Sequence, residues 1–205
     1  MKSIKIKSYL EIKDTFEDED YLSDFKYINI NVCIRTRENT VDSCRFEQCH
    51  FQDCTFTNME CLDVVFDHCT FENVHFVNCS LSRVHFLSCR ISGMEVSNSL
   101  LHDVWFYLCK GPYCDFGGSH FKDCVLDTCD FSESGFIQCE IKKTTYKKCV
   151  FTKSEWYNTS LKDLDFTSCD IDSIGVSSHR IGGVIVNERQ ALEFVKLLGV
   201  VIRSE

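Results

Sequence analysis

The chain has 205 residues, of which 44% are hydrophobic and 26% charged, and its formal net charge is −9. This length suits a single domain, and the acidic excess argues against direct contact with nucleic acid. No apolar run approaches the ~20 residues of a membrane span, and the opening MKSIKIKSYLEIKD lacks the apolar core of a secretion signal. We therefore expect a cytoplasmic protein without membrane or nucleic-acid partners.

Residues 1–43 are expected to form an N-terminal cap. Residues 1–22 show no clear period and carry the acidic run 17–20. The segments Ser23–Tyr27 and Ile28–Val32 resemble two five-residue units centred on Phe25 and Ile30, one residue out of phase with the units that follow. We expect the polar stretch Arg35–Thr40 to absorb this shift as a bulge or loop.

From residue 44 to residue 186 the sequence repeats every five residues, as in CRFEQCHFQDCTF (44–56). We call the recurring aromatic or aliphatic position the centre and the position two residues earlier the flank. Of the 17 phenylalanines 14 occupy centres, and of the 15 cysteines 13 occupy flanks, so the register is not accidental. Neither a helix nor a strand has a period of five.

A second period of twenty residues lies within the first. The flank positions from Cys49 to Cys169 are cysteine at every twentieth residue, and the centres 46, 66, 86 and 106 are all phenylalanine. Four units therefore make one turn, and residues twenty apart stack. We number the four faces by their first centres: Phe46 for face one, Phe51 for face two, Phe56 for face three and Cys61 for face four.

Units such as Cys49–Asp53 (CHFQD) and Cys129–Glu133 (CDFSE) resemble those of the pentapeptide-repeat proteins. The resemblance covers residues 44–186. It implies an all-β solenoid, a right-handed quadrilateral β-helix whose centres and flanks point inward. Seven turns at about 4.8 Å would give a rod roughly 34 Å long.

The cysteines admit three interpretations: disulfides, a zinc site or core packing. Side chains stacked in parallel register point the same way, which is poor disulfide geometry, and C-x2-C ligand spacing is absent. We therefore expect reduced cysteines packed beside phenylalanine. Gly111–Pro112 combines the one centre without a side chain and the only proline, and it predicts a local kink or thin spot.

Residues 187–205 change period and predict a helix over 187–199 followed by a strand over 200–202. Asn187 is a suitable N-cap with Gln190 at the capping-box position, and Gly199 is a suitable stop. The tail QALEFVKLLGVVI resembles the C-terminus of Qnr-type quinolone-resistance proteins, in which the tails join two rods. It implies a homodimer, whereas a helix that only covers the last turn is the alternative. The expected interface residues are Leu192, Phe194, Val195, Leu198, Val200, Val201 and Ile202.

No catalytic site is evident in the sequence. Histidines 50, 75, 85 and 120 precede centres on different faces and should point outward, and His179 occupies a flank and should be buried. Motifs for nucleophilic serine, phosphate binding or zinc proteases are missing. We expect no enzyme activity, no cofactor and no metal.

Acidic residues outnumber basic ones on the outward positions of two adjacent faces, with Arg90, Lys110 and Lys153 as the bases on face two. These acids are expected to bind a partner: Asp53, Glu72, Asp130, Glu133, Asp170 and Asp172 on face two, and Glu95, Asp115 and Glu155 on face three. The Qnr-type resemblance implies a dimeric DNA mimic that binds DNA gyrase or topoisomerase IV and protects it from quinolones or toxins. The alternative is an interaction scaffold for a different protein partner.

Overall fold

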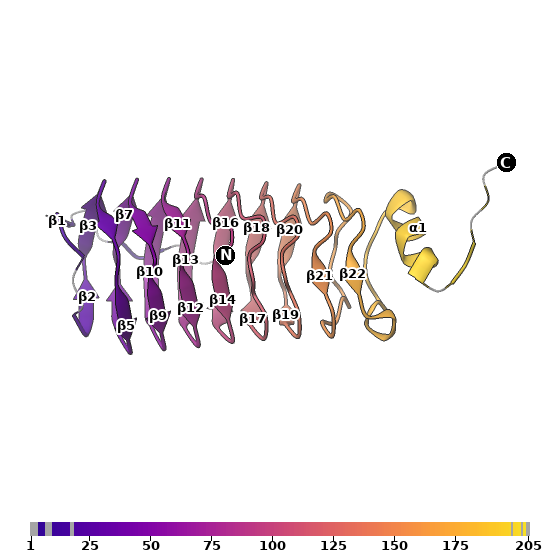
Figure 1. Cartoon of the computed structure of the whole chain (residues 1–205), viewed down its shortest axis with the longest axis horizontal. Helices are drawn as coiled ribbons and strands as arrows, with labels where there is room; N and C mark the ends of the chain where they lie inside the picture. The colour runs from indigo at the N-terminus through magenta and orange to yellow at the C-terminus, as the bar shows by residue number, and fades with distance from the viewer. Residues whose placement is uncertain (1–3, 7–9, 17–18, 198, 202, 204–205) are drawn as a thin grey trace.

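The chain winds into a parallel β-solenoid of about 8 turns that ends in a short helix, α1 (Glu188–Leu197) (Figure 1). This computed structural model describes residues 4–6, 10–16, 19–197, 199–201 and 203. Strands pair with those one turn away at an offset of twenty residues, so that Phe66 lies opposite Phe46 on one side and Phe86 on the other. The predicted fold class is confirmed.

Faces four and one form one sheet, because two eight-residue strands run through the corner between them. These two strands are β10 (Glu60–Asp67) and β13 (Ser80–Leu87). The other strands of face four are β2 (Tyr21–Ser23), β6 (Thr40–Asp42), β15 (Leu100–His102), β17 (His120–Lys122) and β19 (Glu140–Lys142). Those of face one are β1 (Glu11–Lys13), β3 (Phe25–Ile28), β7 (Arg45–Glu47), β16 (Trp105–Tyr107), β18 (Val125–Asp127) and β20 (Thr145–Lys147).

Faces two and three carry shorter strands that give way to single-residue bridges and tight turns after about residue 90, as where the Met94 N–H donates to the Ile91 carbonyl at 3.0 Å. Face two has β4 (Asn31–Val32), β8 (His50–Gln52) and β11 (Thr70–Glu72). Face three has β5 (Arg35–Arg37), β9 (Thr55–Thr57), β12 (His75–Val77), β14 (Glu95–Ser97), β21 (Glu155–Trp156) and β22 (Gly175–Val176). A 3-10 helix, η1 (Ser178–Arg180), precedes α1.

Stacked rings fill the inside of the coil. On face one the ring centroids of Phe46 and Phe66 are 5.0 Å apart, those of Phe66 and Phe86 are 5.0 Å apart, and those of Phe86 and Phe106 are 4.8 Å apart. All four side chains are buried. Each ring contacts the rings one turn away, so this column holds neighbouring turns together. Replacing one such phenylalanine by alanine typically costs about 3–5 kcal/mol of folding stability.

The corners of the coil have left-handed backbone. The residue two after a centre has a positive φ at nearly every corner, as at Asp53 (53°), Asn73 (52°) and Leu108 (54°). Aspartate and asparagine tolerate this conformation better than other side chains. This explains the polar residue between most successive units, whereas Leu108 adopts the corner conformation with strain and an exposed apolar side chain.

The N-terminal turns continue the coil, so the architecture does not change at residues 43 and 44. The inward residues are Leu22, Tyr27 and Val32, which lie opposite Val41, Phe46 and Phe51 at an offset of nineteen residues. The out-of-phase units therefore exist, but their centres were assigned wrongly: Phe25 and Ile30 occupy flanks. Two apolar residues stand two apart in each unit, and the pattern alone did not distinguish them.

The shift in register falls earlier than predicted. Arg35–Arg37 forms β5, which already pairs with β9 at an offset of twenty residues. The missing residue therefore lies between Val32 and Arg35, where Cys33 is exposed. Most of the polar stretch predicted as a loop is strand: Arg35 and Arg37 lie at outward positions of β5, and Thr36 between them is buried opposite Phe56.

Gly111 interrupts neither the ladder nor the core, so the predicted kink is wrong. The Gly111 N–H donates to the Asp130 carbonyl at 2.8 Å, and the Lys110 carbonyl accepts the Ile91 N–H at 2.8 Å. A Cβ added at Gly111 would meet Ile91 Cγ1 at 2.7 Å. The side chain of the turn before fills the space that this glycine leaves, and a larger residue would clash.

Helix α1 begins as predicted. Asn187 Oδ1 accepts the Gln190 N–H, and Gln190 Oε1 accepts the Asn187 N–H, both at 3.0 Å, which is a capping box. Gly199 has φ +75°. Val200 and Val201 form no strand with the rest of the described chain, contrary to the prediction. Within the described residues, no helix is long and apolar enough to cross a membrane.

Candidate interaction surfaces

The acidic residues of face two lie at outward positions, but several stabilise their own backbone. Asp130 Oδ1 accepts the Ser132 N–H at 3.0 Å, and Asp170 Oδ1 accepts the Asp172 N–H at 3.1 Å. An aspartate that binds the backbone two residues ahead stabilises a turn. These two carboxylates therefore have a structural role besides any role in binding.

Two further acids of face two contact side chains one turn away. Glu133 Oε1 accepts a hydrogen bond from the Tyr113 hydroxyl at 3.1 Å, and Asp53 Oδ1 accepts one from Asn73 Nδ2 at 2.6 Å. Both carboxylates remain exposed. Each acid thus adds a link between turns and stays exposed at the surface.

On face three, Glu95 and Asp115 lie in one column of neighbouring turns. Glu95 accepts a hydrogen bond from the Ser97 hydroxyl, and its Oε2 lies 2.8 Å from His75 Nδ1. The Ser97 hydrogen bond and the His75 contact lower the pKa of Glu95, although burial opposes them. Asp115 Oδ1 accepts the Gly117 N–H at 2.8 Å.

The remaining acids are the least engaged. Glu155 and Asp172 are exposed, and their carboxylates contact no partner among the described residues. Glu72 is exposed and lies 3.7 Å from His50 Nε2. These three carboxylates are the most available for an external partner.

Basic residues interrupt both acidic faces. The parallel register places Arg90, Lys110 and Asp130 in consecutive turns of one column on face two. Face three begins with Arg35 and Arg37 of β5, both exposed. Arg90 and Lys110 therefore divide the predicted acids of face two into an early pair, Asp53 and Glu72, and a later group from Asp130 to Asp172, and those of face three lie in its middle and later turns.

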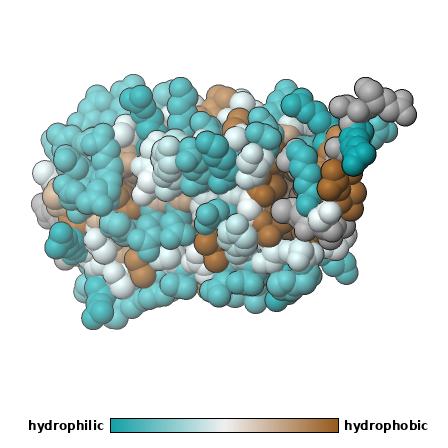
Figure 2. Space-filling model, turned by 45° about the vertical axis from the view of Figure 1, so that its right-hand side comes forward, coloured by the Kyte–Doolittle hydropathy of each residue, from teal (hydrophilic) through white to brown (hydrophobic). Residues whose placement is uncertain are grey.

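The seven residues predicted for a dimer interface divide into three groups. Phe194 is 6% exposed and joins the core, and Val195 is half-buried. Leu192, Val200 and Val201 are exposed. Leu198 and Ile202 lie outside the described residues. Figure 2 shows hydrophobic side chains gathered at the end of the molecule that carries α1, so this end remains apolar after α1 has packed.

Face one carries an apolar surface that the sequence interpretation missed. Leu87, Trp105 and Tyr107 are half-exposed at outward positions, and Leu108 is exposed beside them; we call these four residues the aromatic patch. The centroids of the Trp105 and Tyr107 rings lie 5.1 Å apart. The signal was present in the unit WFY at 105–107, where both neighbours of a centre are aromatic.

His85 borders the aromatic patch. Its ring meets the Trp105 ring edge to face at 5.3 Å, and burial lowers the pKa of His85. His85 Nε2 and Trp105 Nε1 are buried atoms without a hydrogen-bond partner in the described part of the chain. His179, predicted to be buried, is instead exposed in η1.

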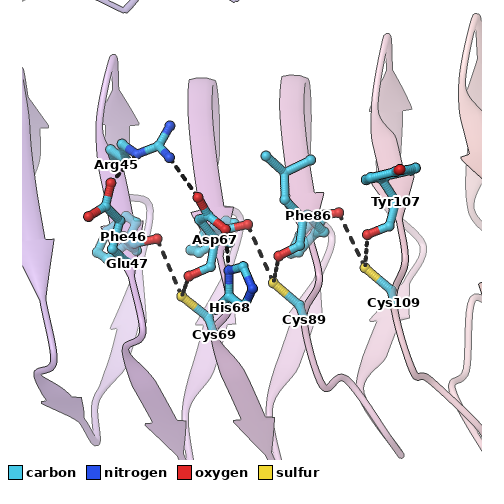
Figure 3. Close-up of polar contacts among 12 residues, drawn as sticks. Arg45, Phe46, Glu47, Asp67, His68, Cys69, Phe86, Cys89, Tyr107 and Cys109 are labelled. Carbon is cyan, nitrogen blue, oxygen red and sulfur yellow. Dashed lines mark hydrogen bonds and ion pairs between the residues drawn. The ribbon is translucent and has the colours of Figure 1, made fainter.

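The cysteine column runs along the inside of the coil (Figure 3). Cys69 Sγ lies 3.4 Å from the Phe46 carbonyl, Cys89 Sγ 3.4 Å from the Phe66 carbonyl, and Cys109 Sγ 3.2 Å from the Phe86 carbonyl. Each thiol thus donates toward the turn before it.

Figure 3 also shows an ion-pair network of Arg45 with Glu47 and Asp67. Arg45 Nε lies 2.5 Å from Glu47 Oε1, and Arg45 Nη2 lies 2.6 Å from Asp67 Oδ2.

The described residues contain no cluster of three or more histidine, cysteine or acidic side chains with metal-binding geometry.

Residues 39–116 match the family model of the pentapeptide repeat region. The chain contains a pentapeptide repeat region. Its register in the structure extends in both directions beyond the matched residues. The search of curated proteins found no match to this chain.

Three solved structures are similar to this chain at low identity. A trypsin-treated variant of QnrB1, a plasmid-mediated fluoroquinolone resistance protein, is 18% identical with a TM-score of 0.42, and the match covers 89% of this chain and 97% of that chain. Full-length QnrB1 is 15% identical with a TM-score of 0.38, covering 88% and 99%. HetL from Nostoc sp. strain PCC 7120 is 7% identical with a TM-score of 0.31, covering 80% and 91%. At these values the comparison carries no functional conclusion for this chain.

Proposed function

We propose that this chain is a non-enzymatic, cytoplasmic protein that binds a type II topoisomerase, DNA gyrase or topoisomerase IV, as a DNA mimic. In this role it protects the enzyme from quinolones or topoisomerase-poisoning toxins. The observation that supports the proposal is the pair of adjacent faces whose exposed carboxylates lie on a straight coil of stacked turns. An acidic rod can compete for a basic groove that normally holds DNA, since complementary fields steer the encounter.

One sequence feature adds support. The tail of this chain resembles the Qnr-type tail, and a dimer joined there would double the length of the rod. The carboxylates of Glu155 and Asp172 are the ones we expect to contact the enzyme first, because no interaction with the described part of the chain restrains them.

The test is a supercoiling assay with purified gyrase, and a decatenation assay with topoisomerase IV, each with and without a quinolone. We expect the chain to inhibit the enzyme or to restore its activity in the presence of the drug. The double variant Glu155→Gln/Asp172→Asn should weaken the effect about tenfold, because it removes two unrestrained charges.

The matched control removes the same charge elsewhere. Glu60→Gln/Glu140→Gln neutralises two exposed acids of face four and should leave the effect unchanged. Equal loss in both double variants would show that net charge alone matters. No effect of the well-folded chain on either enzyme would remove the proposal.

The second candidate function is an interaction scaffold, and the aromatic patch favours it. Trp and Tyr are enriched at protein–protein interfaces, whereas a DNA mimic has no use for them. The double variant Trp105→Ser/Tyr107→Ser separates the two functions: it should leave topoisomerase inhibition intact but abolish binding to a scaffold partner.

A further inference from the structure

The hydrogen-bonded ladder of the coil is open between two particular turns. On face four the Asp123 N–H donates to the Lys142 carbonyl at 3.1 Å, and the Leu161 N–H donates to the Arg180 carbonyl at 3.0 Å. β19 (Glu140–Lys142) and residues 160–163 are the neighbouring turns that lie between these two pairs. No backbone hydrogen bond joins them, although every residue from 138 to 168 is described.

Face one is open between the same turns. No backbone hydrogen bond joins β20 to residues 165–167, all of which are described, and the Lys148 N–H donates to the Ser168 hydroxyl instead, at 3.2 Å. Faces two and three stay closed, because the Phe151 N–H donates to the Asp170 carbonyl at 2.7 Å and the Gly175 N–H to the Ser154 carbonyl at 2.8 Å. The backbone ladder between these two turns is therefore open on faces four and one and closed on faces two and three, while the Tyr146 and Phe166 rings inside stay stacked with centroids 5.2 Å apart.

A groove of about 890 Å³ lies on face four where the ladder is open. β19 lines one side of it, and Ser160 and Lys162 line the other. By the register of the other turns, the missing bonds involve the N–H groups of Ile141 and Lys143 with the carbonyls of Ser160 and Lys162, and the N–H groups of Ser160 and Lys162 with the carbonyls of Cys139 and Ile141. The Lys162 N–H donates to Ser160 Oγ at 3.4 Å instead. Ile141 is half-exposed, whereas most other centres are buried. An edge with unpaired N–H and carbonyl groups is a template for another strand.

Basic side chains surround this groove. Lys162 and Arg180 are exposed and form no ion pair with described residues, and Lys142 lies 3.5 Å from Glu140. Asp163 is the one acid of the lining without an ion pair to a described residue. On a chain whose net charge is −9, this groove is a local site where an acidic ligand is favoured.

We propose that the groove binds an extended acidic peptide segment of a protein partner, which adds as a strand to the free edge of β19. Main-chain hydrogen bonds to Ile141 and Lys143 would supply affinity, and carboxylates placed beside Lys162 and Arg180 would supply specificity, as in other cases of strand addition. This site is separate from the acidic faces and does not depend on topoisomerase binding.

The first test measures amide hydrogen exchange in the free chain. The amides of Ile141 and Lys143 should exchange at least tenfold faster than those of Asp123 and Leu161, which occupy the same positions in closed turns. Equal protection of all four amides would mean that the ladder closes in solution, and it would overturn the proposal.

The second test identifies peptides directly. A phage-displayed library of random twelve-residue peptides is panned on the wild-type chain, with counter-selection on the variant Lys162→Glu/Arg180→Glu. We expect enriched peptides to carry acidic residues at alternate positions. The synthetic peptides should bind the variant at least tenfold more weakly and should protect the amides of Ile141 and Lys143 from exchange.

Two controls make the result decisive. Lys110→Glu/Lys153→Glu reverses two exposed charges on face two and should bind the peptides as the wild type does. Peptides N-methylated at alternate residues should lose binding, because they cannot pair with the strand edge. Failure to enrich any peptide that distinguishes the wild type from the variant, or binding that survives N-methylation, would overturn the proposal.

Discussion

Cysteine serves this coil as a small side chain for the flank position. Thirteen of the fifteen thiols are buried, which confirms that they pack inside. Burial raises the pKa of Cys79 and of Cys124 to about 11, so both remain protonated at neutral pH and are poor nucleophiles. A thiol fits beside a stacked phenylalanine and still donates to a carbonyl of the turn before, which alanine could not do.

Thiol labelling of the native chain with Ellman's reagent should therefore be highly selective. We expect one fast-reacting thiol, Cys33, which is exposed, and a slower one, Cys169, which is half-buried. The other thirteen should react only when the coil unfolds in denaturant. Cys33→Ser should remove the fast phase alone. Several fast thiols in the native chain would contradict the packing described here.

The ion pair of Asp63 and Arg83 predicts a pH dependence of stability. Arg83 Nε and Nη2 donate to the two Asp63 oxygens at 2.7 Å each, and Asp63 is buried. The Arg83 hydrogen bonds lower the pKa of Asp63 more than burial raises it. A lowered pKa in the folded chain stabilises it above the unfolded pKa of about 4, and this stability is lost as the pH falls through the folded pKa.

We expect Asp63→Asn to be about 2 kcal/mol less stable than the wild type at pH 7, and this difference should shrink toward pH 2. Urea unfolding at a series of pH values measures it. Asp123→Asn is the control, since Asp123 is more exposed and its nearest base is His102 at 3.6 Å. A difference that stays constant with pH would mean that the ion pair does not stabilise the fold.

Among the structural elements, those marked by residue types at fixed spacing were predicted best from the sequence. The faces, the turn length and the capping box of α1 follow from residue types at fixed spacing, and the structure confirms them. The first turns were misassigned because Phe25 and Tyr27 are equally apolar, so only the pairing with later turns identifies the inward residue. The open ladder was not predictable, because residues 138–163 keep the repeat without interruption.

Gln190 joins α1 to the coil and should be the most sensitive residue of the helix. Beyond its part in the capping box, Gln190 Nε2 donates to the carbonyls of Phe166 and Cys169, at 2.8 Å each. Asn187→Ala should cost about 1 kcal/mol. Gln190→Glu keeps the capping acceptor but brings a carboxylate against two carbonyls, so it should loosen α1 more than Asn187→Ala does.

Amide hydrogen exchange over residues 191–196, relative to the coil, reports this effect. Arg189→Ala, at an exposed position of the same turn, is the control and should leave exchange unchanged. If Gln190→Glu exchanged as slowly as the wild type, the link between α1 and the last turn would not hold the helix in place.

For the whole molecule, the exposed apolar end beyond α1 argues for a second copy of the chain. Phe194 covers the last turn, so it belongs to the fold rather than to a partner contact. Leu192, Val200 and Val201 remain available. We expect a homodimer joined through these residues, which light scattering would detect as twice the monomer mass of 23.8 kDa.

Leu192→Glu with Val201→Glu should give a monomer that is as stable to heat as its wild-type parent at low concentration. Lys196→Glu, exposed on the same helix, is the matched control and should remain dimeric. A wild-type chain that is monomeric at high micromolar concentration would rule out the dimer and leave α1 as a cover for the last turn.

The offset of twenty residues between neighbouring turns makes the chain a molecular ruler. Each turn contacts only the turns beside it. Phe46, Phe66 and Phe86 occupy the same position in three successive turns and pair in the same register. Deleting residues 66–85 would bring Phe86 directly onto Phe46 and shorten the rod by one step of about 4.8 Å, with both ends unchanged. The separation between the N-terminal turns and α1 can therefore change only in whole steps, and variation in the number of turns would tune the reach of the molecule while leaving its surfaces intact.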